Sequence, residues 1–150
     1  MEQTRDFTQV RSFLNNHGMN EEIVEPGCWL MAWWSGEPIG VVTIETVIDA
    51  AVMRALMVTE SRRGRGVGTA LVAAARDAAH ARGARRLYAL VTQAEADYLR
   101  RFSFADVTRA DLTVTLTDTA IAERMRASPE KFAAHTALCL NLAHYREIIR

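Results

Sequence analysis

The first third of the chain alternates between two hydrophobic periodicities, one typical of helices and one typical of strands. From Asp6 to Asn16 apolar residues recur at intervals of three and four, which predicts a helix that ends at Gly18. Residues Cys28 to Trp34 and Ile39 to Thr46 are extended apolar runs on either side of the turn Ser35-Gly36-Glu37-Pro38. The pattern predicts a β-hairpin here.

The middle third predicts a strand, a glycine-rich turn, a helix and another strand. Ala51 to Thr59 is extended, with alternate residues on opposite faces. Val67 to Arg82 is alanine-rich with helical spacing, and Arg85 to Val91 is a short apolar strand. Thr92 and Glu95 form the sequence pattern of a capping box, which predicts a helix after that strand. This order implies parallel strands joined by a crossover helix, so the fold class is α/β.

The last third has weaker patterns, and the structure of residues 111–135 is the least determined by sequence. Asp111 to Thr117 alternates like a strand, and Asp118 to Met125 has helical spacing. Ser128-Pro129 resembles the start of a helix. Thr136 to Leu142 is expected to be the final strand, in a single domain that spans residues 1–150.

Composition narrows the class of protein. Formal net charge is +0, 49% of residues are hydrophobic and 24% are charged, which is typical of a globular domain and gives no support for nucleic-acid binding. Signal-peptide and membrane-spanning patterns are absent, so the expected location is cytoplasmic, with no membrane partner. Cys28 and Cys139 lie in apolar runs, and the histidines lack ligand spacing, so we expect buried thiols and no metal site.

The segment between the third strand and the alanine-rich helix is the strongest chemical signal. It reads Arg63-Gly64-Arg65-Gly66-Val67-Gly68-Thr69. A turn of this kind directs backbone N–H groups at one point, at the positive end of the helix dipole, where a diphosphate binds favourably. Glycines permit positive φ and close approach, and the arginines add donors. The P-loop needs a lysine after its last glycine, and the spacing GxGxxG is absent, so neither nucleotide motif fits.

The same segment resembles the acetyl-CoA signature of the GNAT superfamily, Gln/Arg-x-x-Gly-x-Gly/Ala, and the order of predicted elements resembles that family over about residues 5–142. A narrower likeness, to small amino-acid acetyltransferases that include arsenic-resistance-associated members, rests on Met53 to Val58 and Met125 to Ser128. The resemblance implies a single mixed central sheet flanked by helices, with an antiparallel N-terminal hairpin and a parallel pair at a splayed cleft. It also implies acetyl-CoA as co-substrate, without a metal.

The resemblance assigns roles to the end of the third strand. Backbone groups of Leu56, Met57 and Val58 would hydrogen-bond the pantetheine arm, and the Val58 N–H would bind the developing oxyanion. The thioester would lie in the cleft between this strand and Leu87 to Val91. The expected acetyl-CoA-binding set is Leu56, Met57, Val58, Arg63, Gly64, Arg65, Gly66, Val67, Gly68 and Thr69.

Two residues are candidates for proton transfer. Glu45 follows an apolar strand and would act as the general base, unless it is a solvated carboxylate at the strand's end. Tyr98 would protonate the leaving thiolate, although relatives place tyrosine at the position of Leu99, and a core tyrosine is the alternative. A water chain would replace Glu45 if the carboxylate plays no part.

Arg54 and Trp33 are the candidate substrate residues. Arg54 lies in a mostly apolar strand, on the face of Val52, Leu56 and Val58, where an uncompensated guanidinium would be costly. It is therefore expected to pair with an internal acid such as Glu45 or with a substrate carboxylate. Of the three tryptophans in the hairpin, one is expected in the core, and Trp33 is a candidate wall of the acceptor pocket.

These features predict acetyl transfer from acetyl-CoA to the primary amine of a small, amino-acid-like molecule, by direct attack in a ternary complex. The alternatives are a catalytically inactive acyl-CoA-binding or regulatory module and a peptide or protein N-acetyltransferase. A homodimer is conceivable through pairing of Asp111 to Thr117 or the final strand with a partner's sheet. The sequence does not identify the acceptor amine.

Overall fold

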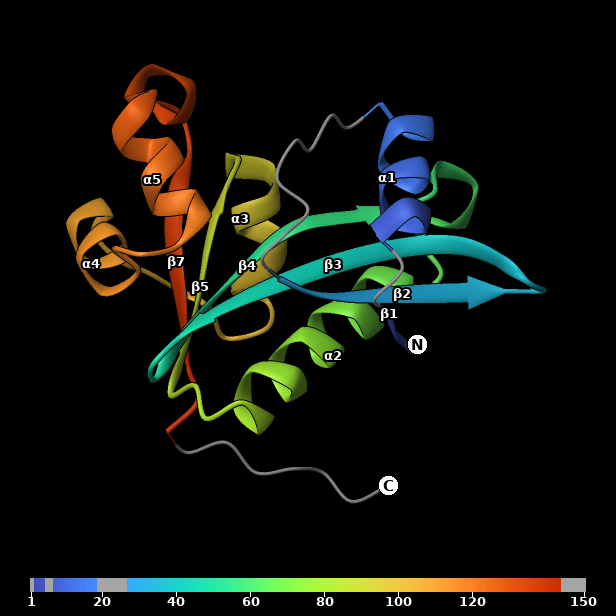
Figure 1. Cartoon of the computed structure of the whole chain (residues 1–150), viewed down its shortest axis with the longest axis horizontal. Coiled ribbons are helices and arrows are strands. Elements are labelled where there is room, and N and C mark those ends of the chain that lie inside the picture. The colour runs from blue at the N-terminus through green and yellow to red at the C-terminus, as the bar shows by residue number, and fades with distance from the viewer. Residues whose placement is uncertain (1, 5–6, 19–26, 144–150) are drawn as a thin grey trace. The chain divides into compact units, whose positions relative to one another are not determined.

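The structure, a computed structural model, describes residues 2–4, 7–18 and 27–143 of the chain (Figure 1). The strands are β1 (Glu2–Thr4), β2 (Cys28–Trp34), β3 (Glu37–Val47), β4 (Ala50–Val58), β5 (Arg86–Val91), β6 (Ala105–Asp106) and β7 (Thr136–Asn141). The helices are α1 (Phe7–Asn16), α2 (Val67–Ala81), α3 (Gln93–Arg100), α4 (Arg109–Thr115) and α5 (Ala120–Ala127), with 3₁₀ turns η1 (Glu60–Arg62) and η2 (Pro129–Phe132). The strands form one mixed sheet in the order β1-β2-β3-β4-β5-β7-β6. The predicted single mixed sheet flanked by helices is confirmed.

The chain divides into two compact units, each assembled from two stretches of sequence. Unit 1 comprises Met1–Glu45 and Met53–Ala78, and unit 2 comprises Thr46–Val52 and Ala79–Arg150. The chain therefore passes between the units three times, and β4 contributes residues to both.

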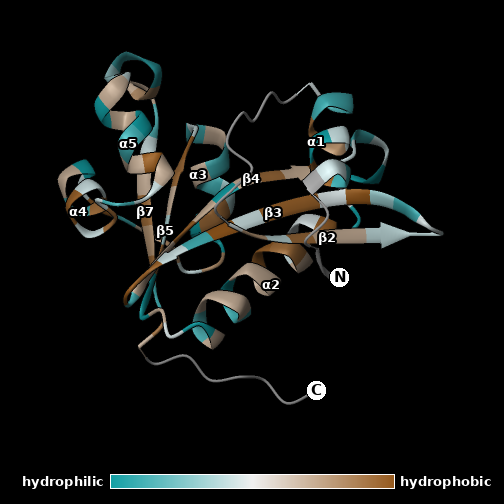
Figure 2. Cartoon of the chain, viewed as in Figure 1, coloured by the Kyte–Doolittle hydropathy of each residue, from teal (hydrophilic) through white to brown (hydrophobic). Residues whose placement is uncertain are grey.

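In unit 1, helices α1 and α2 lie on opposite sides of the strands β2 and β3 (Figure 1). The amphipathic pattern of α1 directs Val10, Phe13 and Leu14 at the sheet. They pack against Trp29, Met31 and Val41, which share one face because β2 and β3 are antiparallel and pair Met31 with Val41. We call these six residues the α1 cluster; the brown inner strands of Figure 2 show how apolar this layer is.

The other face of β3 accepts α2 at very short range, because Gly40 has no side chain. A Cβ added at Gly40 would lie 2.8 Å from Leu71 Cδ1, 3.2 Å from Val67 Cγ1 and 3.2 Å from the Met57 carbonyl oxygen. Contacts this short force the neighbours to move. Gly40 thus sets how closely the first two turns of α2 approach the sheet.

In unit 2, β5 pairs with β7 in an antiparallel ladder from Arg86–Asn141 to Val91–Thr136. The core of unit 2 lies between these strands and the helices α4 and α5. Its buried members are Ala50, Val52, Tyr88, Leu112, Leu116, Ile121, Ala122, Met125 and Ala137.

One expectation for this region is wrong. Residues 111–115 lie in α4 rather than in a strand, and Leu116 is the C-cap of the helix. Thr108 caps the N-terminus by accepting the Asp111 N–H at 3.0 Å, and Leu112 and Leu116, four residues apart, are both fully buried. Such spacing fits a helix, but in a seven-residue run it also passes for alternation. The final strand forms as predicted, and the two-residue strand β6 pairs with it at Leu138 and Cys139.

Candidate functional site

The middle of β4 contains a residue in a conformation that L-amino acids rarely adopt. Ala55 has φ of 55°, in the left-handed region. From Ala50 to Arg54 the strand is buried, whereas from Ala55 to Val58 it is only half-buried. The second half of β4 therefore departs from regular strand geometry at Ala55 and is accessible where the first half is not.

This irregularity also changes which residues share a face. Arg54 lies over the Trp29 ring, 5.8 Å from its centroid, while Ala55 and Met57 pack against the α1 cluster, to which Trp29 belongs. The expectation that Arg54 shares a face with Leu56 and Val58 is wrong. The physical reason is the left-handed residue: it places two successive residues on one face, as a β-bulge does.

The glycine-rich turn has the conformation that its sequence predicts. Gly64 and Gly66 have φ of 77° and 83°, and a Cβ added at either would meet no atom within 4 Å. Residues Arg63 to Gly66 are exposed, and helix α2 begins directly after them. The first hydrogen bond of α2 runs from the Ala70 N–H to the Gly66 carbonyl at 3.0 Å, so the N–H groups of the turn precede it at the positive end of the helix.

The turn is tied to the end of β4 by a side chain. Arg63 Nε donates to the Val58 carbonyl oxygen at 3.2 Å, and the Thr59 N–H donates to the Ile39 carbonyl at 2.8 Å. Of the two predicted phosphate-binding arginines, Arg63 thus also holds the strand end. Arg65 is exposed beside it. The arrangement leaves exposed N–H donors and guanidinium groups on one short segment, which suits a diphosphate.

His17 stabilises the end of β4 through a contact that the sequence patterns did not predict. His17, just after α1, donates through Nδ1 to the Phe13 carbonyl at 2.7 Å, because a carbonyl can only accept. In neutral His17, Nε2 is then the acceptor for the Thr59 hydroxyl, 3.0 Å away. The ring also stacks on Phe13 with 4.1 Å between ring centroids. His17 therefore links α1 to the residue that leads from β4 into the turn, a contact 42 residues apart in sequence that no local pattern signals.

Glu45 is 6% exposed and lies within β3, two residues before its end. The alternative of a solvated carboxylate is therefore wrong. By strand alternation Glu45 shares the face of Val41 and Thr43, the face covered by α1.

The predicted substrate residues also lie on the α1 side of unit 1. Arg54 is 9% exposed, and Trp33 is half-buried and packs against the α1 cluster. The Trp33 indole Nε1 is buried and makes no hydrogen bond with the residues that the structure describes. Trp29 is the fully buried core tryptophan that was expected, and Trp34 is 57% exposed beneath the Arg62 guanidinium.

Tyr98 belongs to unit 2, on α3, where its ring makes an edge-to-face contact with Phe102 at 5.2 Å between centroids. Leu99, one residue further on, is 1% exposed and faces the core. The capping box that opens α3 is present as predicted, with Thr92 and Glu95 exchanging hydrogen bonds. Ser103 has φ of 72°, in the left-handed region that favours glycine.

Two other kinds of site are absent from the part of the chain that the structure describes. Within residues 2–4, 7–18 and 27–143, no cluster of His, Cys, Asp and Glu side chains could hold a metal ion. In the same part of the chain, no helix combines the length and the apolar character needed to cross a bilayer.

Comparison with known proteins places this geometry in a family. Among curated protein sequences, none matches the chain. Among solved structures, a GNAT-family acetyltransferase from Staphylococcus aureus Mu50 superposes with a TM-score of 0.65 at 11% identity, covering 95% of this chain and 97% of that chain. Rv2747 from Mycobacterium tuberculosis, in complex with CoA and NLQ, gives 0.62 at 20% identity, covering 76% and 75%.

N-acetylglutamate synthase from Neisseria gonorrhoeae, complexed with coenzyme A and N-acetyl-glutamate, gives a TM-score of 0.63 at 20% identity; the match covers 91% of this chain but 28% of the synthase. At these identities the likeness concerns the fold. The profile of the acetyltransferase (GNAT) family matches residues 2–104, which is more than half of the sequence. The chain therefore belongs to the acetyltransferase (GNAT) family.

Proposed function

We propose that the protein transfers the acetyl group of acetyl-CoA to the primary amine of a small molecule that carries a carboxylate, by direct attack in a ternary complex. The observation that carries the proposal is the continuous segment from Ala55 to Gly68: a left-handed residue, a half-buried strand end, and an exposed glycine-arginine turn that leads into α2. The narrower likeness to amino-acid acetyltransferases stays a prediction.

The turn and the strand end would bind the co-substrate, which supplies the activated acetyl group. N–H groups from Gly64 to Thr69 and the guanidinium of Arg65 fit the diphosphate, and the absence of side-chain atoms at Gly64 and Gly66 leaves the space that it needs. Leu56 and Met57 would offer main-chain hydrogen bonds to the pantetheine arm. The Val58 N–H would stabilise negative charge on the carbonyl oxygen during attack.

The α1 side of unit 1 would supply the groups that act on the acceptor. Arg54 would bind the acceptor's carboxylate, which a guanidinium does with two parallel hydrogen bonds. Trp33 would contact the acceptor's carbon chain and offer its buried indole N–H. Glu45 would remove the amine proton, and Tyr98, which belongs to unit 2 and not to this side of unit 1, would return a proton to the leaving thiolate. The N-acetylglutamate synthase structure is complexed with coenzyme A and N-acetyl-glutamate, and a carboxylate-bearing acceptor agrees with that product.

The test is a thiol-release assay with acetyl-CoA and matched pairs of amines, each amino acid beside its carboxamide. We expect amino acids to be acetylated with a KM at least about tenfold below that of the amides, since a charge-assisted hydrogen bond contributes about 1.5–3 kcal/mol. Arg54→Met should remove that preference and leave acetyl-CoA affinity, measured by calorimetry, nearly unchanged.

Three outcomes would count against the proposal. Acetyl-CoA binding without turnover of any amine would indicate an inactive acyl-CoA-binding module. Turnover of peptides but not amino acids would indicate a peptide acetyltransferase. A loss of thermal stability in Arg54→Met with unchanged KM would assign Arg54 to an internal ion pair.

A further inference from the structure

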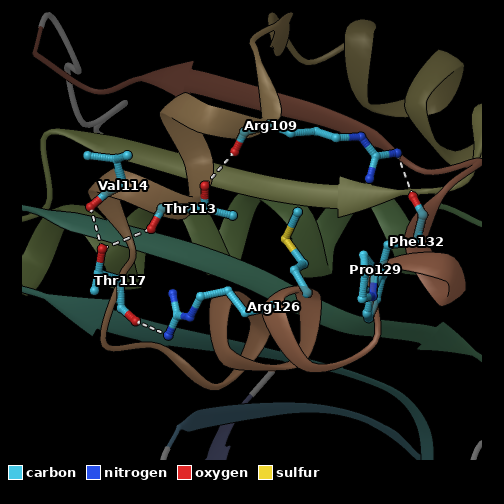
Figure 3. Close-up of a pocket in the computed structure, with 8 residues that line it drawn as sticks. Arg109, Thr113, Val114, Thr117, Arg126, Pro129 and Phe132 are labelled. Carbon is cyan, nitrogen blue, oxygen red and sulfur yellow. Dashed lines mark hydrogen bonds between the residues drawn. The ribbon is translucent and has the colours of Figure 1, made fainter.

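Unit 2 contains a surface pocket that none of the residues assigned above helps to form. It has a volume of about 660 Å³ and lies between α4, α5 and η2 (Figure 3). Pockets for small organic ligands span roughly 300–1,000 Å³. All its lining residues fall between Arg109 and Phe132, after the last residue that matches the family profile. The pocket is therefore a feature of this chain's C-terminal region and is not explained by the family's common part.

The lining combines apolar surface with positive charge and contains no acidic residue. Met125 is buried, Phe132 is half-buried and Val114 is 74% exposed, so the apolar part extends from the interior to the rim. The only charged groups in the lining are the guanidinium groups of Arg109 and Arg126. A ligand that matches these features has an anionic group and an apolar body.

Both guanidinium groups are held in place through one nitrogen. Arg109 Nη2 donates to the carbonyls of Phe132, Ala133 and His135, and Arg126 Nη2 donates to the Thr117 carbonyl at 2.9 Å. In Figure 3 the two groups lie at different ends of the pocket, one beside Phe132 and the other beside Thr117.

The remaining donors of these arginines are available to a ligand. Among the described residues, none accepts a hydrogen bond from Nε or Nη1 of Arg109 or Arg126. Fixing a guanidinium in advance lowers the entropy cost of binding an anion. Two pre-positioned guanidinium groups beside apolar side chains suit a ligand in which a carboxylate is attached to a hydrocarbon.

We propose that this pocket binds a small organic carboxylate with an apolar body. The carboxylate pairs with Arg126, whose guanidinium makes one hydrogen bond with the described residues against three for that of Arg109, and the hydrocarbon packs on Met125, Phe132 and Val114. Arginine binds phosphate as well as carboxylate, so the apolar contact is what separates an organic acid from inorganic phosphate.

The test uses the whole chain labelled with ¹⁵N, titrated with hexanoate, with hexanamide as a neutral probe of the same shape, and with inorganic phosphate. Amide-shift changes report weak binding and identify the segment that binds. We expect hexanoate to shift amides of α4, α5 and η2, with an affinity about tenfold or more above that of hexanamide and of phosphate, because each probe lacks one of the two contacts.

The exposed rim residue allows a charge test that leaves the core intact. Compared with Val114→Gln, which removes the same apolar contact without adding a charge, Val114→Lys should strengthen hexanoate binding and Val114→Glu should weaken it. Arg126→Gln should weaken binding about tenfold or more. Arg124→Gln is the matched control: it removes the same charge from the same helix, and Arg124 does not line the pocket. Thermal unfolding of each variant verifies its fold.

Equal affinity for hexanoate and hexanamide, hexanoate binding unaffected by Arg126→Gln and Val114→Glu, or no binding of any probe would overturn the proposal. Displacement of hexanoate by phosphate at equal concentration would show a general anion site and would also overturn it. A dimer in light scattering that Val114→Glu dissociates would assign the pocket to a second copy of the chain.

Discussion

Glu45 and Arg54 are both less than 10% exposed, on neighbouring strands of unit 1. Burying an ionisable side chain costs free energy unless its charge is compensated, and such groups concentrate at binding and catalytic sites. The Trp29 ring, with the Arg54 guanidinium 5.8 Å from its centroid, contributes part of that compensation for the cation. The α1 side of unit 1 is therefore where single substitutions are most informative about chemistry.

Glu45→Gln keeps the shape of the side chain and removes its basicity. If Glu45 takes the amine proton, kcat should fall by about 10²-fold or more, the usual scale of base catalysis. Acetyl-CoA affinity should persist, because Glu45 precedes the phosphate turn and lies on a different strand. Steady-state kinetics and calorimetry on the same preparation check both expectations. If the variant keeps more than about a third of the wild-type kcat, the proton leaves by another route.

Cys139 pairs with Tyr88 across β5 and β7, and burial raises the pKa of its thiol to about 11, with the nearby Arg86 cation acting more weakly in the opposite direction. Since thiolate is the reactive form, the alkylation rate of Cys139 near pH 8 should be about 100-fold below that of an ordinary thiol of pKa 9.0. Peptide mass spectrometry after iodoacetamide treatment at several pH values measures this for Cys139 alone.

The raised pKa of Cys139 also makes the stability of the folded protein depend on pH. The pKa of the Cys139 thiol in the folded protein lies above its ordinary value of 9.0, so folding favours the protonated thiol. This contribution is complete below about pH 9 and is lost as pH rises toward 11. Tyr88 acts in the same direction, because burial raises its pKa as well. An alkylation midpoint near 9 in the folded protein would contradict the assignment, and denaturation in guanidinium chloride is the control.

At the scale of elements, the proposed diphosphate site is formed by the turn between β4 and α2 together with the first turn of α2. Gly66 has φ of 83°, whereas Gly68 lies within α2. A side chain at Gly66 therefore strains the turn in addition to obstructing a ligand, so a loss of acetyl-CoA binding in Gly66→Val alone has two causes.

Gly68→Ala separates these causes. Alanine is favoured over glycine in a helix by about 1 kcal/mol, so the free energy of unfolding should hold or rise. Acetyl-CoA affinity should nevertheless fall by about tenfold or more if the diphosphate approaches the first turn of α2. Gly66→Ala is the companion variant, expected to lose both stability and affinity. Unchanged affinity in a stable Gly68→Ala protein would contradict the diphosphate site.

In the β3–β4 connection, Ile48 combines a strained backbone conformation with a fully exposed side chain. Ile48 has φ of 40° and is 100% exposed. The left-handed region costs a residue with a Cβ roughly 1–2 kcal/mol, so Ile48→Gly should raise the free energy of unfolding by about 1 kcal/mol in chemical denaturation. Ile48→Ala keeps the Cβ and removes only the exposed hydrocarbon; its stability should stay close to wild type. Equal stabilisation by both variants would show that exposure, and not backbone strain, is the cause.

Sequence patterns predicted the elements whose signals are local. The hairpin, α2, β5 and the capping box of α3 formed at or within two residues of the expected positions, because periodicity, glycine turns and capping depend on neighbouring residues. The patterns failed where distant contacts decide. Ala55 adopts a left-handed conformation although it is not a glycine. Helix α4 is stabilised by the burial of Leu112 and Leu116 in the core of unit 2. The His17–Thr59 hydrogen bond joins residues that are 42 positions apart in the sequence.

At the scale of the whole molecule, the two units divide the candidate chemistry. Unit 1 contains the phosphate turn, the half-buried strand end and the buried Glu45 and Arg54, so the proposed acetyl-CoA contacts and acceptor contacts depend on the packing of α1 and α2. Unit 2 contains Tyr98 and the C-terminal pocket. A substitution in the core of unit 2 that spares unit 1 is therefore expected to affect proton return and the pocket before it affects acetyl-CoA binding.

The assignment of Thr46–Val52 to unit 2 has a consequence for dissecting the protein into pieces. Ala50 and Val52 are fully buried in the core of unit 2, although 26 residues of unit 1 separate them from the rest of it. A fragment that begins at Ala79 would lack these side chains and expose the surface that they cover. Residues 46–52 comprise the end of β3, the connecting turn and the start of β4. Supplied as a separate peptide, they would restore that core by complementation, as added strands do in other sheet proteins. Unit 2 is therefore better probed by complementation with this peptide than by truncation alone.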